Sequence, residues 1–348
     1  NVKFRNIIIN GDMSIAQRGT SLTGLTSSGH FVCDRWRFSY DTSPGTYSMS
    51  QSTDVPTGQG FANSLKVECT TANSSLDSDD FVAIEQRFEG QMLQYLKKGT
   101  ANAESTTLSL WVKSSQTGKR SVELRDQDNN RHIAGTFTVS SANTWEKKTI
   151  TFAGDTTGVF GNDNARSLDL KIFYTVGSRW TGGTLATSWQ SRVDGNTADS
   201  TQAQLGSASG NNIYITGVQL EAGEVASDFE FLPHDVNKHR CLRYFQDLAP
   251  KKNDCRIAIG ENVNTNRTDP VFQYVEKRAN PSVTFSAANT FSLYHSNTSR
   301  DCTSLTADNF SEICGNLNAN VSSGLTAGGA NQFITNGTGS QLFVDAEL

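Results

Sequence analysis

The chain has 348 residues, enough for one large and one smaller hydrophobic core, and its net charge is −5. Its densest basic patches are the pairs Lys97-Lys98 and Lys251-Lys252, so nucleic acid is not an expected partner. No apolar run approaches the roughly 20 residues that span a bilayer, which argues against membrane insertion. With 29 Gly, 19 Phe, 8 Tyr and 5 Trp, the composition is typical of a globular, β-rich chain.

The first two-thirds of the chain predicts strands separated by turns. The first covers Phe4–Asn10 and runs into an Asn-Gly-Asp turn. Because the chain opens almost directly into it, we expect no signal peptide, and because Asn1 is not an initiator methionine we expect processing or a preceding segment. Alternating apolar and polar residues then fit a two-sheet sandwich. These strands are predicted over Arg35–Tyr40, Thr46–Gln51, Ser64–Cys69, Val82–Phe88, Ser105–Ser114, Arg120–Asp126, Ile133–Val139, Trp145–Phe152 and Leu168–Val176.

Two segments depart from this pattern before the sandwich closes. Glu85–Leu96 has apolar residues three to four positions apart, which predicts a short helix capped at Lys97–Gly99. Residues 177–212 are rich in Gly, Ser and Thr, and an excursion of this length is usually functional or poorly ordered. Asn212–Glu221 alternates again and predicts the closing strand.

A predicted helix separates this region from a second one. Asp235 is a good N-cap, and Val236, Leu242 and Phe245 share one apolar side of a helix over Asp235–Asp247. The predicted organisation is a domain over 1–234, a linker helix over 235–248 and a small β domain over 249–348. Pro270 is expected at a strand start or edge. Strands of the second domain are predicted over Ile257–Ile259, Val271–Val275, Ser282–Ser286, Phe291–His295, Gln332–Thr335 and Gln341–Val344.

Several separated blocks of sequence resemble bacteriophage tail fibres and related appendages that carry a carbohydrate-binding-module-like domain. They occur in one order along residues 4–246, and a weaker block, Pro270–Thr284, resembles the small β domain that often follows. The blocks are Asn6–Thr20, Asp34–Trp36, Ile84–Gly90, Thr106–Gly118, Asn143–Thr157, Ile213–Leu232 and Arg240–Gln246. The resemblance implies an all-β fold with an N-terminal jelly roll and a location on the outer surface of the virion, in a tail or capsid appendage.

Two functions follow from the resemblance. The first is a fibre or receptor-binding protein whose jelly roll binds host-surface glycan, and the alternative is a capsid decoration, head-fibre or tail-adaptor protein that binds other virion proteins. A homotrimer is the oligomeric state that the resemblance implies, and Val236, Leu242 and Phe245 are candidates for its interface.

The 177–212 excursion supplies candidate glycan-binding residues. Sugar sites combine a few placed polar groups with an apolar or aromatic surface, and the candidates have these side chains. They are Arg179, Trp180, Trp189, Gln190 and Arg192. The alternative is that the two tryptophans hold the loop on the sandwich or lie in a subunit interface, which are common settings for Trp. Trp36, Trp111 and Trp145 lie in or beside predicted strands and are expected in the core.

A structural calcium is a further candidate, because carbohydrate-binding jelly rolls often hold one where the first and last strands meet. Asn10, Asp12 and Glu221 occupy the matching places, although a turn aspartate and a surface glutamate are the simpler interpretation of so few oxygen ligands. No other cofactor is expected. The cysteines lack zinc-type spacing and are expected to be buried thiols, with a Cys302–Cys314 disulfide as an alternative.

Nothing in the sequence predicts catalysis. None of the hydrolase, metalloprotease or nucleotide-binding motifs is present, and the five histidines are scattered singly. The densest acidic run, Asp77–Asp80, is interpreted as a solvated loop. A polysaccharide-cleaving enzyme needs two carboxylates about 5–10 Å apart across a groove, and no such pair can be assigned from the sequence. We therefore expect a binding protein.

Overall fold

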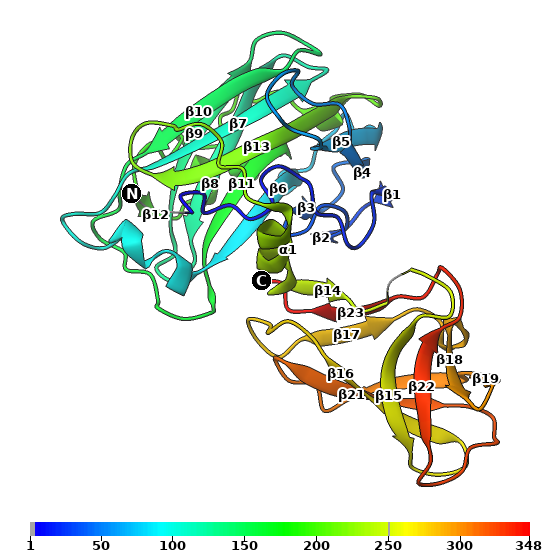
Figure 1. Ribbon diagram of the computed structural model, residues 1–348. Coiled ribbons are helices and arrows are strands. Elements are labelled where there is room, and N and C mark those ends of the chain that lie inside the picture. The colour runs from blue at the N-terminus through cyan, green and yellow to red at the C-terminus, as the bar shows by residue number, and fades with distance from the viewer. Residues whose placement is uncertain (1–3, 250) are drawn as a thin grey trace. The chain divides into compact units, whose positions relative to one another are not determined.

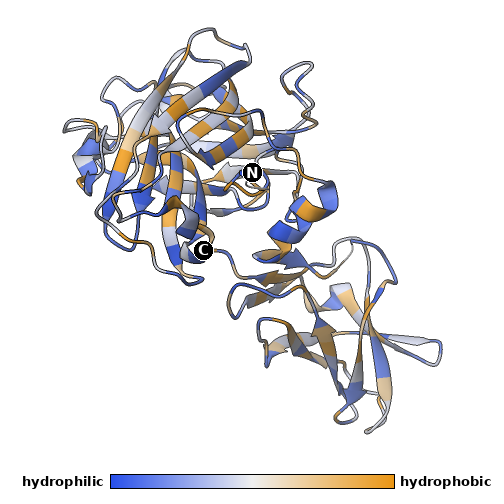
Figure 2. Cartoon of the chain, turned by 60° about the vertical axis from the view of Figure 1, so that its left-hand side comes forward, coloured by the Kyte–Doolittle hydropathy of each residue, from blue (hydrophilic) through white to orange (hydrophobic). Residues whose placement is uncertain are grey.

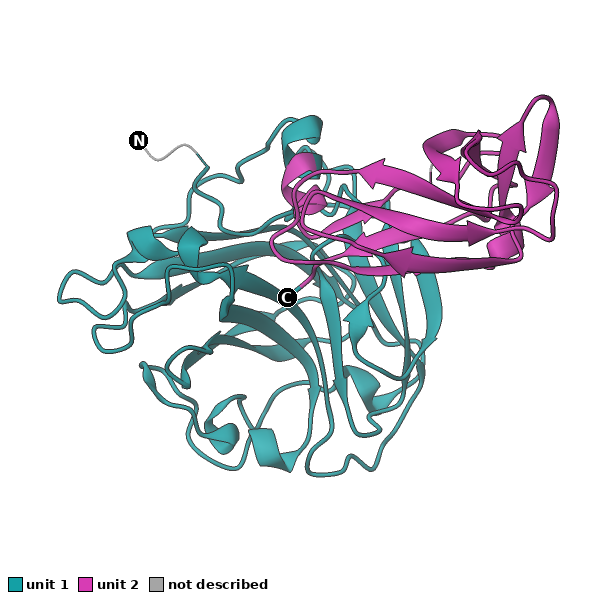
Figure 3. Cartoon of the chain, turned by 90° about the horizontal axis from the view of Figure 1, so that it is seen from below, with its two compact units in different colours: residues 1–238, 348 teal, residues 239–347 magenta. Residues whose placement is uncertain are grey.

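The computed structural model describes residues 4–249 and 251–348. By residue contacts the chain divides into unit 1, Asn1–Lys238 with Leu348, and unit 2, His239–Glu347 (Figure 3). Residues 1–3, which bear on the expected processing of the N-terminus, lie outside the described residues. Within the described part of the chain, no helix has the length and hydrophobicity needed to cross a membrane.

Unit 1 consists of two antiparallel sheets, sheet A and sheet B (Figure 1). Sheet A runs in the order β1 (Ser21–Leu25), β4 (Thr46–Ser52), β5 (Ser64–Thr71), β13 (Asn212–Ala222), β7 (Thr106–Ser114) and β10 (Glu146–Phe152). Sheet B runs in the order β12 (Gln190–Ser191), β9 (Arg131–Val139), β8 (Gly118–Asp126), β11 (Arg166–Val176), β6 (Phe81–Glu89), β3 (Arg37–Asp41) and β2 (Gly29–His30). The predicted all-β class with an N-terminal jelly-roll sandwich is confirmed.

One hydrophobic core joins the two sheets. Leu110 and Ile215 of sheet A are buried in the same cluster as Val122 and Ile172 of sheet B. Figure 2 shows the alternation of hydrophobic and hydrophilic residues along the strands. Since successive side chains of a strand point to opposite faces, the residues between these core positions lie on the outer faces of the sheets.

The predicted first strand at Phe4–Asn10 is wrong, because this segment is irregular. Ile7, Ile8 and Ile9 are all buried, so this run of three residues has no exposed face. The side chain of Gln86 replaces a neighbouring strand, since its Oε1 accepts from Ile9 N at 2.7 Å and its Nε2 donates to Ile9 O at 2.9 Å. Asn10, with φ 59°, then turns the chain.

The predicted helix over Glu85–Leu96 is also wrong. Residues 85–89 belong to β6, which pairs with β11 and β3, and only two single turns follow, η1 (Gly90–Met92) and η2 (Gln94–Leu96). The 177–212 excursion is likewise folded, through η3 (Ser178–Trp180), β12, η4 (Asp194–Asn196) and η5 (Leu205–Ser207). Cross-strand pairing therefore outweighs the helical spacing of the apolar residues.

Unit 2 contains two further antiparallel sheets. One runs β14 (Phe245–Asp247), β23 (Leu342–Asp345), β17 (Ser282–Phe285). The other runs β19 (Thr298–Asp301), β18 (Phe291–His295), β22 (Ala330–Thr335), β15 (Arg256–Asn262), β16 (Arg267–Gln273), β21 (Cys314–Asn320), β20 (Ser304–Asp308), and η6 (Ala288–Thr290) precedes β18. Pro270 lies inside β16, between β15 and β21, and not at a start or edge as predicted. The ladder to β21 skips Asp269 and Pro270, where the missing donor is tolerated.

The predicted linker helix is shorter than expected. α1 (His234–Leu242) ends before Phe245, which lies in β14 and pairs with Asp345 of β23. Cys302 and Cys314 are free thiols, so the alternative disulfide is not formed. Burial raises the pKa of Cys302 to about 12, so this thiol stays protonated.

Candidate functional site

The structure separates the two tryptophans of the excursion. Trp180 lies on the outer side of sheet B, where its ring meets Phe81 edge-on at a centroid distance of 5.2 Å. The guanidinium groups of Arg179 and Arg192 lie 5.1 and 5.6 Å from its ring centroid. Because Trp180 is 8% exposed and its Nε1 donates to Asp79 O, it holds the loop on the sheet and offers little surface for stacking.

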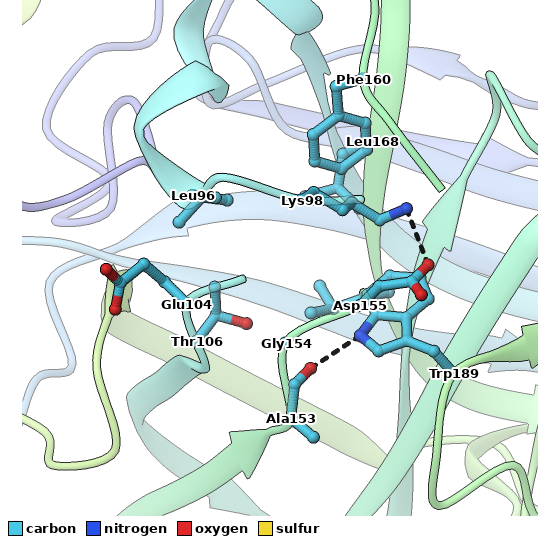
Figure 4. A pocket seen from close by; sticks show the side chains of 11 residues that line it. Leu96, Lys98, Glu104, Thr106, Ala153, Gly154, Asp155, Phe160, Leu168 and Trp189 are labelled. Atoms are coloured by element: carbon cyan, nitrogen blue, oxygen red, sulfur yellow. Dashed lines mark hydrogen bonds and ion pairs between the residues drawn. The ribbon is translucent and has the colours of Figure 1, made fainter. Parts of the chain in front are cut away.

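Trp189 lies apart, beside a small cavity of about 20 Å³ (Figure 4). Its Nε1 donates to Ala153 O at 2.7 Å, and the ammonium of Lys98 lies 4.8 Å from its ring centroid. Lys98 is buried between Asp126, Asp155 and the carbonyl of Gly158. The cavity holds about one water molecule, so it is part of the packing of this end of the sandwich and too small for a sugar ring.

Gln190 and Arg192 complete the edge of sheet B. Gln190 pairs with His132 of β9 through β12, and the amide of Gln190 lies 3.4 Å from His132 Nε2. Arg192 lies 3.6 Å from Glu123 Oε1 of β8. The structure therefore brings Arg179, Trp180, Gln190 and Arg192 to the outer side of sheet B and leaves Trp189 out.

The candidate calcium ligands do not converge. Both amide atoms of Asn10 are used internally, with Ile15 N donating to Oδ1 at 3.0 Å and Nδ2 donating to Ile15 O at 2.9 Å. Asn237 Nδ2 donates to Asp12, whereas Glu221 accepts from the amide and hydroxyl of Ser227. In residues 4–249 and 251–348, no three His, Cys, Asp or Glu side chains form a metal-binding group. These three residues have structural partners, and calcium stays a prediction.

The candidate interface residues do not share one helix face. Val236 and Leu242 are half-buried in α1, whereas Phe245 is 1% exposed in β14 and packs against Phe343 at 5.0 Å. Phe245 is therefore a core residue of unit 2. The sequence analysis missed a more exposed apolar pair, Ile259 and Val271, which lie directly opposite each other on β15 and β16 and are 66% and 60% exposed.

A charged ladder covers the outer face of sheet B. Each of three strands carries an acid, one core residue and a base: Glu85-Gln86-Arg87 in β6, Glu123-Leu124-Arg125 in β8 and Asp169-Leu170-Lys171 in β11. The two-residue period of a strand places acid and base on the same face. The three strands are neighbours in the order β8-β11-β6. Acids and bases of three distant segments therefore meet on one surface.

The antiparallel register places opposite charges across from each other. Lys171 lies between Glu85 and Glu123, and Asp169 lies between Arg87 and Arg125. Directly opposed side chains on one face of a sheet have Cβ atoms about 5 Å apart, close enough for ion pairs. The acid-x-base repeat thus gives two rows of alternating charge across three strands.

Three flanking arginines add positive charge to the ladder. Arg37 of β3 donates to Glu85 at 2.8 Å, and Arg166 of β11 donates to Asp169 at 2.6 Å. Arg192 lies 3.6 Å from Glu123 and also pairs with Asp194. We call the six cations of the ladder and its flanks the basic face. They are Arg37, Arg87, Arg125, Arg166, Lys171 and Arg192, and they lie with three buried acids, Glu85, Glu123 and Asp169.

The positive charge keeps the buried acids ionised. Burial alone raises the pKa of Glu123, but the hydrogen bond from His132 Nδ1 at 2.9 Å and the charge of Lys171 outweigh burial, and the pKa lies below its ordinary value. The pKa of Glu85 is lowered in the same way, against burial, by Lys171, Arg87 and Arg37. Burial and the nearby Arg192 lower the pKa of Arg125, as expected where cations outnumber acids.

The flanking arginines form ion pairs with acids of the ladder. Fewer acids therefore remain to pair with the bases of the ladder. Asp169 is bound by Arg166 and Gln127, and Arg125 forms no hydrogen bond or ion pair within the described residues. Lys171 has an ion pair with Glu85 at 3.5 Å but no hydrogen bond within the same residues. Glu123 Oε2 is buried and likewise has no hydrogen-bond partner there. Polar groups of this kind usually bind water or a ligand.

Sheet A presents a second, aromatic surface that the sequence analysis missed. Trp36 is in the core as predicted, but Trp111 and Trp145 are half-exposed on the outer face, so their predicted core position is wrong. Trp145 meets Tyr214 at a centroid distance of 6.2 Å, and its Nε1 donates to Asp54. Trp111 lines a cavity of about 390 Å³ together with Phe61, Phe229, Phe231, Lys147 and other residues.

No family model and no curated protein matches this sequence. Solved structures give distant likenesses. The enzymatically active domain of tailspike protein 4 of bacteriophage CBA120 is 12% identical over 63% of this chain and 22% of its own, with a TM-score of 0.32. TmCBM61, solved with β-1,4-galactotriose, is 11% identical over 63% of this chain and 99% of its own, with a TM-score of 0.32. The family 11 carbohydrate-binding module from Clostridium thermocellum is 12% identical over 60% and 98%, with a TM-score of 0.29.

Proposed function

We propose that this protein is a non-enzymatic component of the outer surface of a bacteriophage particle and binds host-surface carbohydrate through the basic face of sheet B. The observation that carries the binding site is the guanidinium of Arg125, which has no hydrogen bond or ion pair within the described residues, next to Lys171, whose ammonium has one ion pair and no hydrogen bond there. Sugar hydroxyl groups accept hydrogen bonds, so one saccharide can accept from the donors of both cations. The sequence blocks that resemble phage appendages support the location.

The electrostatics of the face favour binding over catalysis. A glycosidase needs a carboxylic acid whose pKa is raised, so that it carries a proton to the leaving group near neutral pH. Glu85 and Glu123 have lowered pKa values and therefore stay ionised. Their role in the proposal is to hold the cations in place.

The test is binding of the full chain to an array of bacterial surface polysaccharides. The wild type is expected to bind, and the double variant Arg125→Ala, Lys171→Ala is expected to lose at least tenfold in affinity. The matched control removes an aromatic and a cation from the outer face of sheet A, Trp111→Ala with Lys147→Ala, and should bind like the wild type. Binding that is lost in the sheet A variant and kept in the sheet B variant would move the site to the aromatic surface.

A blank array combined with binding of the protein to phage particles would support the alternative, a decoration or adaptor protein. The same preparation tests the homotrimer that the resemblance implies, through its mass in solution by light scattering. Release of reducing ends from a bound polysaccharide would contradict the non-enzymatic part of the proposal.

A further inference from the structure

We infer that the carbohydrate bound by the basic face is an acidic polysaccharide, with a carboxylate of the sugar held between Arg125 and Lys171. The inference rests on the proposed function, because it specifies the ligand of the same site. Three observations lead to it: the charge of the face, the donors of Arg125 and Lys171 that form no hydrogen bond within the described residues, and the way in which the register places those two cations.

The basic face has a local charge opposite to that of the chain. Six cations lie with three acids on the ladder and its flanks, whereas the whole chain has a net charge of −5. Further out, Arg179 and Arg192 pair with Asp194, and Glu89 lies at the end of β6. Arg87 donates to the carbonyl oxygen of the C-terminal residue, Leu348, at 2.6 Å. The excess of cations over acids therefore belongs to the ladder and its immediate flanks, where the proposed contact lies. A neutral sugar gains nothing from such an excess, whereas an anion does.

Arg125 and Lys171 are the cations that the protein leaves available. Every acid of the ladder has a closer partner, since Arg166 binds Asp169, His132 binds Glu123, and Arg37 binds Glu85. A guanidinium group has five N–H donors in a planar arrangement that matches a carboxylate. The half-buried guanidinium of Arg125 has none of these donors engaged within the described residues.

The register brings the two cations within reach of one anion. Arg125 is opposite Asp169 and Lys171 is opposite Glu123, so Arg125 and Lys171 are diagonal neighbours on β8 and β11. Diagonal neighbours on one face have Cα atoms about 7–8 Å apart, and long side chains span that distance. A carboxylate bound between them would pair with Arg125 in place of Asp169, which Arg166 already binds.

The experiment compares acidic polysaccharides with their neutral forms. Polygalacturonate, alginate and hyaluronan are each presented to the full chain beside the carboxyl-reduced derivative, and affinity is measured by calorimetry. We expect at least one acidic form to bind at least tenfold more tightly than its reduced form. Arg125→Gln should abolish that preference, whereas Lys147→Gln, which removes one positive charge from sheet A, should preserve it.

Each remaining outcome is decisive. Equal binding of acidic and reduced forms at the basic face overturns the inference and leaves the proposed function in place. Binding of none of the six probes overturns both. Equal binding of poly-L-glutamate would show that charge alone suffices and would overturn the assignment to a saccharide. Loss of the preference in Lys147→Gln as well as in Arg125→Gln would also contradict the site.

Discussion

Arginine residues on the basic face have different roles, although they look alike in the sequence. Arg166 is an ion-pair partner of the buried Asp169, whereas Arg125, which is opposite Asp169 on β8, makes no ion pair in the described structure. Removing one partner of a buried pair leaves an uncompensated charge, whereas removing an unpaired cation relieves repulsion between like charges. Stability and ligand binding should therefore depend on different arginines.

Arg166→Gln should lower the free energy of unfolding by about 2 kcal/mol, because Asp169 would keep only Gln127 as a side-chain partner. Arg125→Gln should change it by less than about 0.5 kcal/mol. Urea denaturation of both variants beside the wild type measures the difference. A loss of stability in Arg125→Gln equal to that of Arg166→Gln would show that Arg125 has a structural role and would remove the basis for a binding role.

At the scale of strands, alternation of apolar and polar residues was sufficient to predict most of unit 1. Ser64–Cys69 and Asn212–Glu221, for example, lie within β5 and β13. The short polar strand β19 was missed because its sequence, Thr-Ser-Arg-Asp, has no buried face, and its pairing with β18 comes from the hairpin. The Ile7–Ile9 run was misread because the chain is buried on all sides there.

The candidate site was only partly predictable. The acid-x-base repeats at 85–87, 123–125 and 169–171 are visible in the sequence, and the period of a strand places each pair on one face. That the three strands are neighbours is a matter of topology, since β8, β11 and β6 are far apart along the chain. The excursion residues were predicted as one site, but Trp189 belongs to the packing around Lys98.

A bulge in β13 gives a prediction about local backbone strain. Gly217 has φ +58°, and a Cβ atom there would lie 2.5 Å from the ring of Phe61. Gly217→Ala should therefore cost about 2 kcal/mol or more, from the left-handed backbone and the clash together. Gly58→Ala is the control, because Gly58 has a similar φ of +76° but no atom within 4 Å of the added Cβ. Thermal unfolding should show the larger loss at Gly217, and equal losses would contradict the packing against Phe61.

The loop after β10 gives a prediction about the stability of the protein at low pH. Burial raises the pKa of Asp155, but hydrogen bonds from Arg131 and Lys98 outweigh it and lower the pKa from 3.8 to about 2. A carboxylate with a lowered folded-state pKa contributes stability above its unfolded pKa and loses it as pH falls through the folded value. The midpoint temperature of thermal unfolding should therefore decrease as the pH is lowered from 4 to 2. Arg131→Gln should weaken this dependence, and an unchanged pH profile in that variant would contradict the assignment.

At the scale of the whole molecule, an acidic chain bears a cationic surface. The net charge of −5 repels a polyanion at long range, whereas the basic face attracts it at contact. The Debye length falls from about 14 Å at 50 mM salt to about 4–5 Å at 500 mM, which screens half-buried pairs only in part.

Affinity for an acidic polysaccharide should therefore fall at least severalfold between 50 and 500 mM salt. Calorimetric titrations at several salt concentrations measure this dependence. Affinity that stays constant over the range would indicate that hydroxyl contacts, and no charge, dominate the complex. The Arg125→Gln variant should show a shallower salt dependence than Lys147→Gln, because only the former loses a cation at the proposed contact.

The buried ammonium of Lys98 has a consequence for handling the protein. It contacts the carboxylate of Asp155 (Figure 4), and the carboxylate of Asp126 and the Gly158 carbonyl complete a set of oxygen atoms of the kind that binds a metal ion. Here the cation is covalently attached to the chain, so it cannot be extracted by a chelator or lost on dialysis. The charge balance at this end of the sandwich should therefore not depend on the concentration of metal ions in the solution.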